Sequence, residues 1–271
     1  MTAVTVSKSP KQQWYHPTVS PEHGVYVMLG IAFLTGAAAA QQWTWTTTLT
    51  LVCAYYGFQA EHPLVLQIKQ RHSWKPRFLV WAGIYGGIAG GIALWLLWQR
   101  HDSWSLPGIY GAVLVAAIVD GVSVRWRQQK SVFNELVTFS AVCLAAPLAY
   151  VATVGTLSTS VIALWLLNTL FFSSAIFSVK LRKVREASIT SGLIFHTIAI
   201  GIVVTLWQLH WLAPITAAAL GVSLLKFGFI LWQKDWYCNS KIQHVAMLET
   251  VASLLFLLIV ALSLLPPYLT V

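Results

Sequence analysis

The sequence contains few charged residues. Asp, Glu, Lys and Arg occupy 9% of its 271 positions, whereas a typical soluble domain devotes about 25% to them. Hydrophobic residues make up 57% of the chain, and the mean hydropathy is +0.69. A soluble protein of this length needs a charged surface, and this chain has too little charge to form one. We therefore predict an integral membrane protein whose surface faces lipid.

Acidic residues are the scarcer of the two signs, with eight against seventeen Lys and Arg, which gives a formal net charge of +9. On a soluble domain such an excess would indicate nucleic-acid binding. Here the basic residues form short clusters between apolar runs, which is the pattern that membrane insertion produces. The sequence therefore predicts membrane lipids as partners and no nucleic acid, and it does not indicate a protein partner.

Several catalytic and metal-binding signatures are absent from the sequence. The three cysteines, Cys53, Cys143 and Cys238, show no Cys-x-x-Cys spacing and no disulfide framework. There is no phosphate-binding P-loop, no HExxH, no GxSxG and no dinucleotide fingerprint. The first 24 residues contain no hydrophobic stretch typical of a cleavable signal peptide. We expect no bound metal and no cofactor.

The apolar runs predict an all-α bundle of about nine transmembrane helices, because a span needs about 20 mostly apolar residues. A cytoplasmic tail, 1–23, would precede one transmembrane domain, 24–265, and a short external tail, 266–271, would follow it. The predicted spans are 24–41, 43–60, 77–98, 106–124, 132–152, 159–179, 189–207, 213–232 and 244–265. The first two could instead form one re-entrant hairpin over residues 24–60.

The distribution of basic residues predicts the orientation of the bundle. In this layout all seventeen Lys and Arg residues except Arg100 lie at or near one side of the membrane. Cytoplasmic loops carry an excess of Lys and Arg, so we place the N-terminus in the cytoplasm and the C-terminus outside.

Ionisable residues in the predicted spans concentrate in the cytoplasmic half. Such residues are costly in lipid and usually face a cavity or a partner. The candidates for acid–base or polar contacts are Glu22, His23, Glu135 and Glu249. For Glu22 an ordinary helix start with Ser20 as the N-cap is the alternative.

Other polar residues have simpler interpretations. Asp120 could pair with Arg125 or Arg127, Lys226 could extend its amine to the headgroup region, and His196 is expected to be a structural core residue. Glu61 and His62 precede Pro63, where a helix commonly ends.

Three basic clusters on the predicted cytoplasmic side could bind an anionic headgroup or a phosphate. We expect the clusters and the buried acids to surround one pocket open to the cytoplasm. The candidate headgroup-binding residues are Lys69, Arg71, Arg77, Arg125, Lys130, Lys180, Arg182 and Lys226.

Four segments resemble the YwiC-like family of bacterial membrane proteins, whose function is largely unassigned. They are 21–24 (Pro-Glu-His-Gly), 130–136 (Lys-Ser-Val-Phe-Asn-Glu-Leu), 145–150 (Ala-Ala-Pro-Leu-Ala-Tyr) and 177–182 (Phe-Ser-Val-Lys-Leu-Arg). The resemblance extends over most of the chain. It implies a multi-pass protein of a bacterial inner membrane, or of a thylakoid membrane if the source is a cyanobacterium, and no particular reaction.

The layout is also similar, more distantly, to the UbiA-type prenyltransferase superfamily, whose members bind a prenyl diphosphate through magnesium at two aspartate-rich motifs. This chain departs from that pattern, because loops 61–76 and 180–188 contain Glu61 and Glu186 but no Asp. A basic loop would also repel magnesium. The resemblance implies a bundle that binds an isoprenoid or lipid with an anionic head, or a prenyltransferase-like enzyme without the magnesium motifs.

Two other functions remain open at this point. A small-molecule transporter could use the same pocket, although only Pro147 is expected to interrupt a span. A non-catalytic assembly subunit could dock through the glycines of span 77–98.

Overall fold

The computed structural model describes residues 16–71, 73–100, 104–183 and 189–265, and these residues form helices and no strand. The predicted tail 266–271 and most of the tail 1–23 lie outside the described residues, as do Arg185 and Glu186 of the predicted cytoplasmic loops. The helices are α1 (His23–Ala40), α2 (Trp45–Lys69), α3 (Pro76–Gln99), α4 (Ser105–Arg125), α5 (Val132–Cys143), α6 (Ala145–Val154), α7 (Thr159–Lys183), α8 (Ile189–Gln208), α9 (Pro214–Ala218), α10 (Gly221–Trp232), α11 (Lys234–Asn239) and α12 (Ile242–Leu264).

The predicted class, an all-helical polytopic membrane protein, is confirmed. Within the described residues, eight segments are long and apolar enough to cross a membrane: α1, α3, α4, α5 with α6, α7, α8, α9 with α10, and α12. The remaining predicted span, 43–60, corresponds to α2, which has 25 residues, carries a run of threonines near its start and contains Glu61. These polar residues make α2 less apolar than the other eight segments.

Residues 24–60 form two separate antiparallel helices joined by a short turn. Gln41 ends α1 in the left-handed region, with φ 54°. Thr44 then starts α2, because its hydroxyl accepts a hydrogen bond from the Thr47 amide and the Thr47 hydroxyl accepts one from the Thr44 amide. This reciprocal cap satisfies two amide groups that a helix start leaves without partners.

The expected helix end before Pro63 is wrong, because α2 continues through this proline to Lys69. A proline inside a helix removes one backbone hydrogen bond and crowds the preceding turn. Such prolines are tolerated in membrane helices where neighbouring helices support the backbone. Pro63 is buried here, and α2 packs along the length of α3. Glu61 and His62 therefore lie inside a helix rather than at its end.

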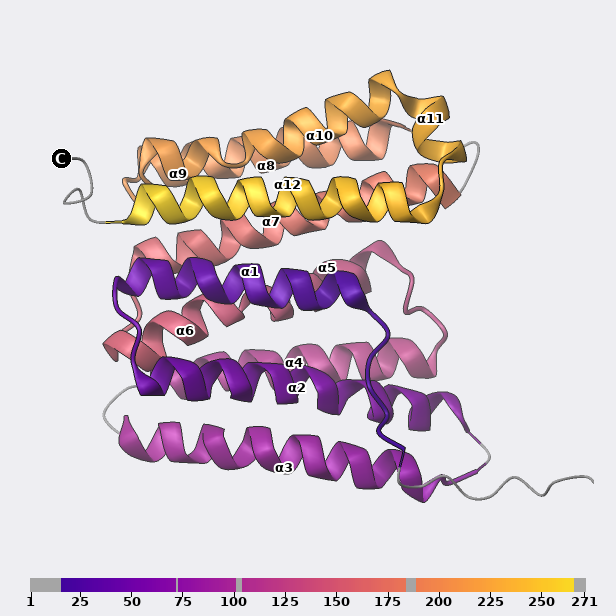
Figure 1. The fold of residues 1–271 in the computed structure, drawn as a ribbon, viewed down its shortest axis with the longest axis vertical. Coiled ribbons are helices and arrows are strands. Elements are labelled where there is room, and N and C mark those ends of the chain that lie inside the picture. Colours follow the sequence, from indigo (N-terminus) through magenta and orange to yellow (C-terminus); the bar gives the residue numbers. More distant parts are fainter. Residues whose placement is uncertain (1–15, 72, 101–103, 184–188, 266–271) are drawn as a thin grey trace, which may run out of the picture.

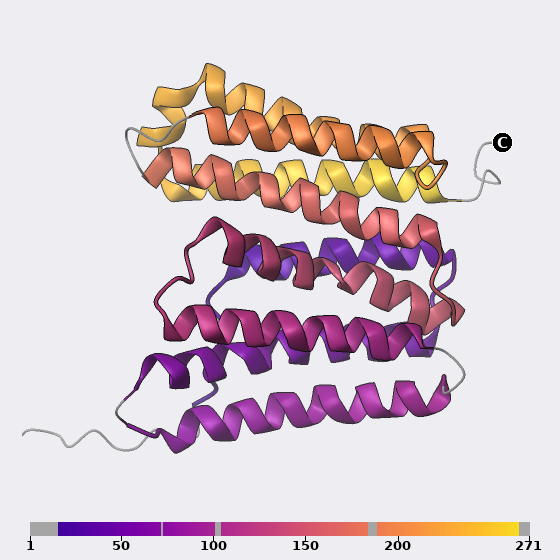
Figure 2. The ribbon, with the colours of Figure 1, turned by 180° about the vertical axis from the view of Figure 1, so that it is seen from behind.

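The helices lie nearly parallel or antiparallel to one another in two groups, α1 to α6 and α7 to α12 (Figure 1). α1 lies between the groups and packs on α6 on one side and α12 on the other. It is apolar on all faces, which is typical of a buried helix. Figure 2 shows the same stack from behind, with α3 at one edge. Exposed apolar side chains on α3, α4 and α12 then provide the surface that contacts lipid.

Two predicted spans are interrupted. Pro147 lies in the first turn of α6, just after α5 and α6 separate at Leu144. The interruption expected at this proline is therefore present. The second break, at Ala219 and Leu220 between α9 and α10, was not predicted, since no proline occurs there. Both breaks leave the two pieces in nearly the same direction (Figure 1).

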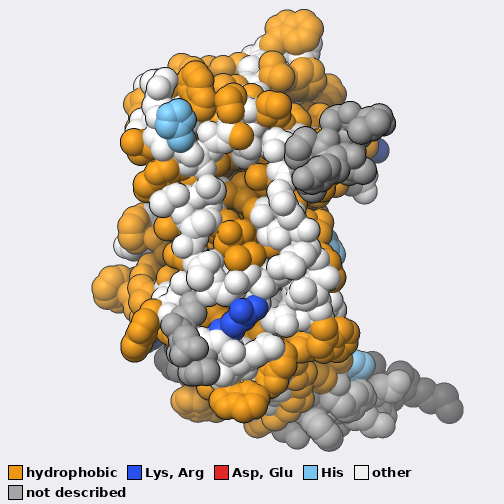
Figure 3. Space-filling view, turned by 90° about the vertical axis from the view of Figure 1, so that its left-hand side faces the viewer, with side chains coloured by type: hydrophobic (Ala, Val, Ile, Leu, Met, Phe, Trp, Pro, Cys, Tyr) orange, Lys and Arg blue, Asp and Glu red, His pale blue; other side chains and the backbone are white. Residues whose placement is uncertain are grey.

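One end of the bundle carries almost all of the basic side chains that the structure describes, and we call it the basic end. It includes Lys69, Arg71, Lys75, Arg77, Arg125, Arg127, Lys130, Lys180, Arg182, Lys234 and Lys241. Figure 3 views the opposite end, which is almost entirely apolar or uncharged, with little blue and no red among the described residues. The two ends match the predicted distribution of charge, and their orientation relative to the cytoplasm remains a prediction.

Candidate functional site

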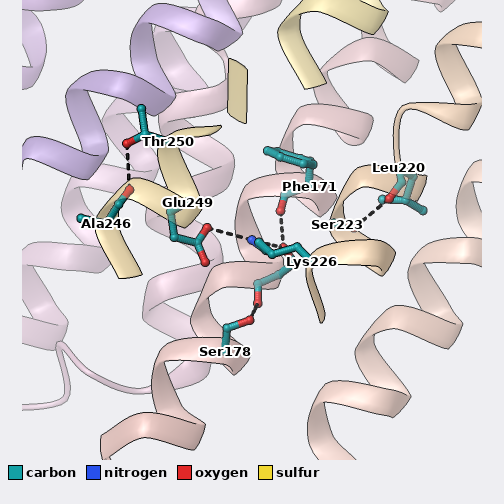
Figure 4. Close-up of polar contacts among 9 residues, drawn as sticks. Phe171, Ser178, Leu220, Ser223, Lys226, Ala246, Glu249 and Thr250 are labelled. Carbon is teal, nitrogen blue, oxygen red and sulfur yellow. Dashed lines mark hydrogen bonds and ion pairs between the residues drawn. The ribbon is translucent and has the colours of Figure 1, made fainter. Parts of the chain in front are cut away.

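A buried ion pair connects three helices in the second group, and we call it the Lys226 centre. The side chain of Lys226 on α10 is 2% exposed, and its Nζ lies 2.8 Å from Oε2 of Glu249 on α12. The same Nζ donates a hydrogen bond of 3.2 Å to the hydroxyl of Ser174 on α7. The Phe171 ring, also on α7, lies with its centroid 5.6 Å from Nζ. Figure 4 shows the Glu249 carboxylate and the Lys226 amine pointing toward one another.

Helix α7 supplies the polar side of this centre because its buried face carries small hydroxyl and amide groups. Ser173, Ser174, Ser178 and Asn168 are all fully buried. The hydroxyl of Ser174 donates to the Phe171 carbonyl at 2.6 Å, and the hydroxyl of Ser178 donates to the Ser174 carbonyl at 3.3 Å. Hydroxyl groups that bond to their own helix backbone can be buried without a large penalty.

Four buried polar atoms near this centre have no hydrogen-bond partner among the described residues: Glu249 Oε1, Ser173 Oγ, His196 Nε2 and the Tyr237 hydroxyl. The other ring nitrogen of His196 lies 2.7 Å from the carbonyl of Gly192. Burial raises the pKa of the Tyr237 phenol on α11, and the nearby Glu249 carboxylate adds to this effect. Polar atoms left in this way usually mark water, a ligand or a functional group.

His196 is expected from the sequence to be a structural core residue. Its ring stacks on the Phe227 ring with 4.2 Å between centroids, one position after Lys226 on α10. The side chain is 4% exposed. His196 is thus packed like a core residue, and it also lies beside the Lys226 centre.

Glu135 and Lys180 form a second ion pair, between α5 and α7. Lys180 Nζ lies 3.2 Å from Glu135 Oε2, and both side chains are about one-third exposed or less. The other members of the predicted polar stripe serve the backbone. The Ser131 hydroxyl caps α5 by accepting from the Asn134 amide, and the Thr138 hydroxyl donates to the Asn134 carbonyl.

Asp120 accepts a hydrogen bond from a residue that the sequence did not single out. Nδ2 of Asn134 donates to Asp120 Oδ1 at 2.7 Å, and both side chains are buried. The carboxyl group of Glu61 on α2 lies within hydrogen-bonding reach of Asp120. The interpretation in which Asp120 simply pairs with Arg125 or Arg127 therefore leaves out Asn134 and Glu61. Asn134 lies inside segment 130–136, which resembles the YwiC-like family. This resemblance is the sequence feature that could have identified Asn134.

A pocket of about 400 Å³ opens at the basic end, where α2 and α4 finish, and we call it the basic pocket. Its volume falls within the range of small-molecule sites. None of the described residues that line it is acidic. The lining residues are Lys69, Gln70, Arg71, Ser73, Lys75, Val124 and Arg127.

The eight predicted headgroup-binding residues have different surroundings. Lys69 and Arg71 line the basic pocket, whereas Arg125 and Lys130 are exposed nearby on the same end. Lys75 and Arg127 complete the pocket but were not among the eight. Lys180 and Lys226 are held in the two ion pairs.

Three predicted headgroup-binding arginines donate to backbone carbonyls. Arg71 donates to the carbonyl of Arg125 while it also lines the basic pocket. Arg182 donates to the carbonyls of Tyr237 and Ser240 at 3.2 and 2.5 Å, and so attaches α7 to the segment around α11. Arg77 donates to the carbonyl of His16 at 2.9 Å and holds the segment before α1. Sequence patterns reveal such cations but do not indicate that their donors are occupied.

Glu22 and His23 are exposed at the start of α1. Glu22 itself occupies the N-cap position, so the predicted N-cap at Ser20 is wrong by two residues. A fully buried glutamine on α2 organises this region instead, because Gln59 accepts from the Ser20 amide and donates to the Tyr26 hydroxyl. No sequence pattern distinguishes Gln59 from the other residues of its helix.

The comparisons with known proteins assign part of the chain to a family. A family model described as "YwiC-like protein" matches residues 19–150, which contain α1 to α6 and the basic pocket. No curated protein and no solved structure matches the chain. The Lys226 centre and the resembling segment 177–182 lie beyond the matched range. The match over residues 19–150 agrees with the predicted resemblance to the YwiC-like family, which three of the four quoted segments carry within that range.

Proposed function

We propose that this membrane protein binds an amphiphile with a phosphorylated or other anionic head, a lipid or an isoprenoid, at the basic pocket. The observation that carries the proposal is a concave site lined by Lys69, Arg71, Lys75 and Arg127 without an acidic residue among its described lining. Four positive charges around one hollow repel each other unless an anion is present. Arginine and lysine are also the residues that proteins use to bind phosphate.

The position of the pocket in the fold fits an amphiphile better than a fully soluble anion. The pocket lies where α2 and α4 end, with α3 starting beside it. Basic groups just outside a hydrocarbon core attract anionic lipid heads. The outer faces of α3 and α4 expose apolar side chains such as Val80, Ile84 and Val122. An alkyl or isoprenoid tail could lie along these faces while the head occupies the pocket.

The arrangement also places two acids close behind this pocket. Asp120 precedes the pocket residue Val124 by one turn of α4, and Glu61 lies two turns before Lys69 on α2. Carboxyl groups at that depth would disfavour a second anion and would orient the head toward the loop. They do not by themselves define a reaction, so the proposal is limited to binding.

The test measures binding of farnesyl diphosphate and of phosphatidylglycerol to the purified protein in detergent, by native mass spectrometry and by tryptophan fluorescence. Farnesol and phosphatidylcholine serve as matched probes without net negative charge. We expect the anionic probes to bind and the matched probes to bind at least about tenfold more weakly, because one charged hydrogen bond contributes about 1.5–3 kcal/mol. The stronger of the two anionic probes identifies the source of the head.

A double variant, Lys69→Gln with Arg127→Gln, removes two charges from the pocket and should lower this affinity at least tenfold, to about the level of the uncharged probes. The matched control, Lys234→Gln with Lys241→Gln, removes two charges from the same end but outside the pocket. Equal losses of affinity in both double variants would mean that the effect depends on net charge alone, and would refute binding at the basic pocket. Unchanged binding in the pocket variant would do the same.

A further inference from the structure

The Lys226 centre contains more charge than helix packing requires. Lys226 is buried, and a buried ammonium among membrane helices is costly and is usually retained for function. Its charge is balanced by one carboxylate, Glu249, while the Ser174 hydroxyl and the Phe171 ring add weaker contacts. Replacing such a pair with apolar residues often leaves a protein equally stable. Packing of α10 against α12 alone does not account for it.

The two partners differ in their access to the surroundings. The side chain of Glu249 is 25% exposed, whereas that of Lys226 is 2% exposed. Glu249 lies about two turns from the start of α12, at the basic end. The Glu249 side chain is therefore reached from that end before Lys226 is, although its Oε1 atom is itself buried. One carboxylate oxygen, Oε2, is taken by Lys226, and Oε1 has no hydrogen-bond partner among the described residues.

The helices packed around this pair carry other titratable groups. Among the described residues, His196 on α8 and Tyr237 on α11 are titratable neighbours of the centre, and neither a neutral imidazole nor a protonated phenol carries a charge. Arg182 on α7 lies farther along the helix and binds backbone carbonyls.

Helices α1 and α9 also pack on α12 but add no charge beside the pair. The ionisable side chains of α1, His23 and Tyr26, lie in its first turn, and α9 has none. The protonation of Glu249 therefore decides the charge balance of the centre.

We propose that Glu249 is a reversible proton-binding site and that its protonation releases Lys226. A hydronium ion from the basic end transfers its proton to Oε1, which converts the carboxylate to a neutral carboxylic acid and leaves water. Lys226 keeps its protons and its positive charge. It then retains only the Ser174 hydroxyl and the Phe171 ring, which do not neutralise a buried ammonium.

The fold offers a way for the released lysine to become hydrated. Helix α10 continues α9 through a tighter helical turn at Ala219 and Leu220, where hydrogen bonds to the third residue back replace the regular α-helical ones. Such a turn is a common hinge position, and α10 would tilt there. Tilting about this break would bring Lys226 toward the basic end and water. Proton uptake at Glu249 is thereby linked to the position of α10. This site lies outside the basic pocket and does not depend on anion binding there.

The experiment follows the carboxyl group of Glu249 by infrared difference spectroscopy on protein reconstituted in vesicles, from about pH 9 to about pH 4. Other carboxyl groups, such as Glu61, also protonate in this range, so the signal of Glu249 is the component of the protonated-carboxyl band that differs between the wild type and Glu249→Gln. We expect this component in the wild type and its loss in Glu249→Gln. The matched control is Glu135→Gln, which changes the other ion-paired glutamate and should keep this component. If the spectra of the wild type and Glu249→Gln are the same over the whole range, the proposal is wrong.

A second measurement separates a proton switch from a static pair. In wild-type protein labelled with ¹⁵N-lysine, the Nζ signal of Lys226 should change over the same pH range as the infrared band, because the two groups lose their contact together. A Nζ signal that stays constant while the band forms would overturn the linkage.

Discussion

Replacing Gly36 with alanine tests the closest approach between the helices of the first group. A Cβ atom at Gly36 on α1 would lie 2.0 Å from the carbonyl oxygen of Ala146 and 2.7 Å from its carbonyl carbon and Cα. These are backbone atoms of α6, just after its break from α5, so no side chain can rotate away. The two helices would have to separate, and α1 packs extensively on α6.

The magnitude follows from a matched pair of variants. Overpacking of this kind costs about 1–3 kcal/mol, and alanine gains about 0.5–1 kcal/mol over glycine inside a helix. Gly30→Ala on the same helix has no atom within 4 Å of its new Cβ, so it receives only the gain. The gain is common to both variants and cancels in their difference. Gly36→Ala should therefore be about 1–3 kcal/mol less stable than Gly30→Ala.

The assay is reversible unfolding in mixed micelles, with dodecyl sulfate added to a mild detergent and helix content followed by circular dichroism. The free energy of unfolding is compared between the two variants and the wild type. Equal stability of Gly36→Ala and Gly30→Ala would refute the close contact between α1 and α6.

Two further variants test cations whose donors are occupied by backbone. Arg182→Gln should lower the free energy of unfolding by about 1–3 kcal/mol, since two carbonyls lose a charged donor, and should leave binding of farnesyl diphosphate unchanged in the same titration. Arg100→Gln should cost about 1 kcal/mol in the same unfolding assay, because Arg100 donates to the carbonyls that end α6, at 3.3 and 2.9 Å. A loss of ligand binding in Arg182→Gln without a loss of stability would contradict the first, and no change in unfolding for Arg100→Gln would contradict the second.

The spans could be predicted from the sequence because hydropathy is a local property of 20 or so residues. The limits of local reasoning are visible in α2. Its polar threonines form a helix cap and buried hydroxyl contacts, such as the one of 2.7 Å between Thr47 and Thr153. Proline commonly ends a helix, but Pro63 lies inside α2 because neighbouring helices support the backbone there. The threonine contacts and the continuation of the helix past Pro63 both depend on tertiary neighbours, which a single sequence does not identify.

The same limit of local sequence reasoning applies to the candidate site. Buried acids and basic clusters were recognised from position alone, but their partners were not. Lys226 was expected to reach the headgroup region, and instead it pairs with Glu249, 23 positions further along the chain. Asp120 was matched with nearby arginines, and Asn134 from the next helix holds it. Partners on different helices depend on packing angles and registers, which single-sequence patterns do not contain.

The polar residues of α7 explain how the two helix groups remain together in lipid. Apolar contacts between membrane helices gain little over contacts with lipid, so close packing and polar contacts hold them. Asn168 donates to the Thr35 hydroxyl of α1 at 3.0 Å, and Lys180 pairs with α5. On its other side, Ser174 accepts from Lys226 of α10. Since α7 is bound to both groups by polar contacts, a movement of α10 that follows proton uptake would act on the helix that also holds α5. The proton site and the family-matched half are therefore physically connected through α7, although no residue is shared between the basic pocket and the Lys226 centre.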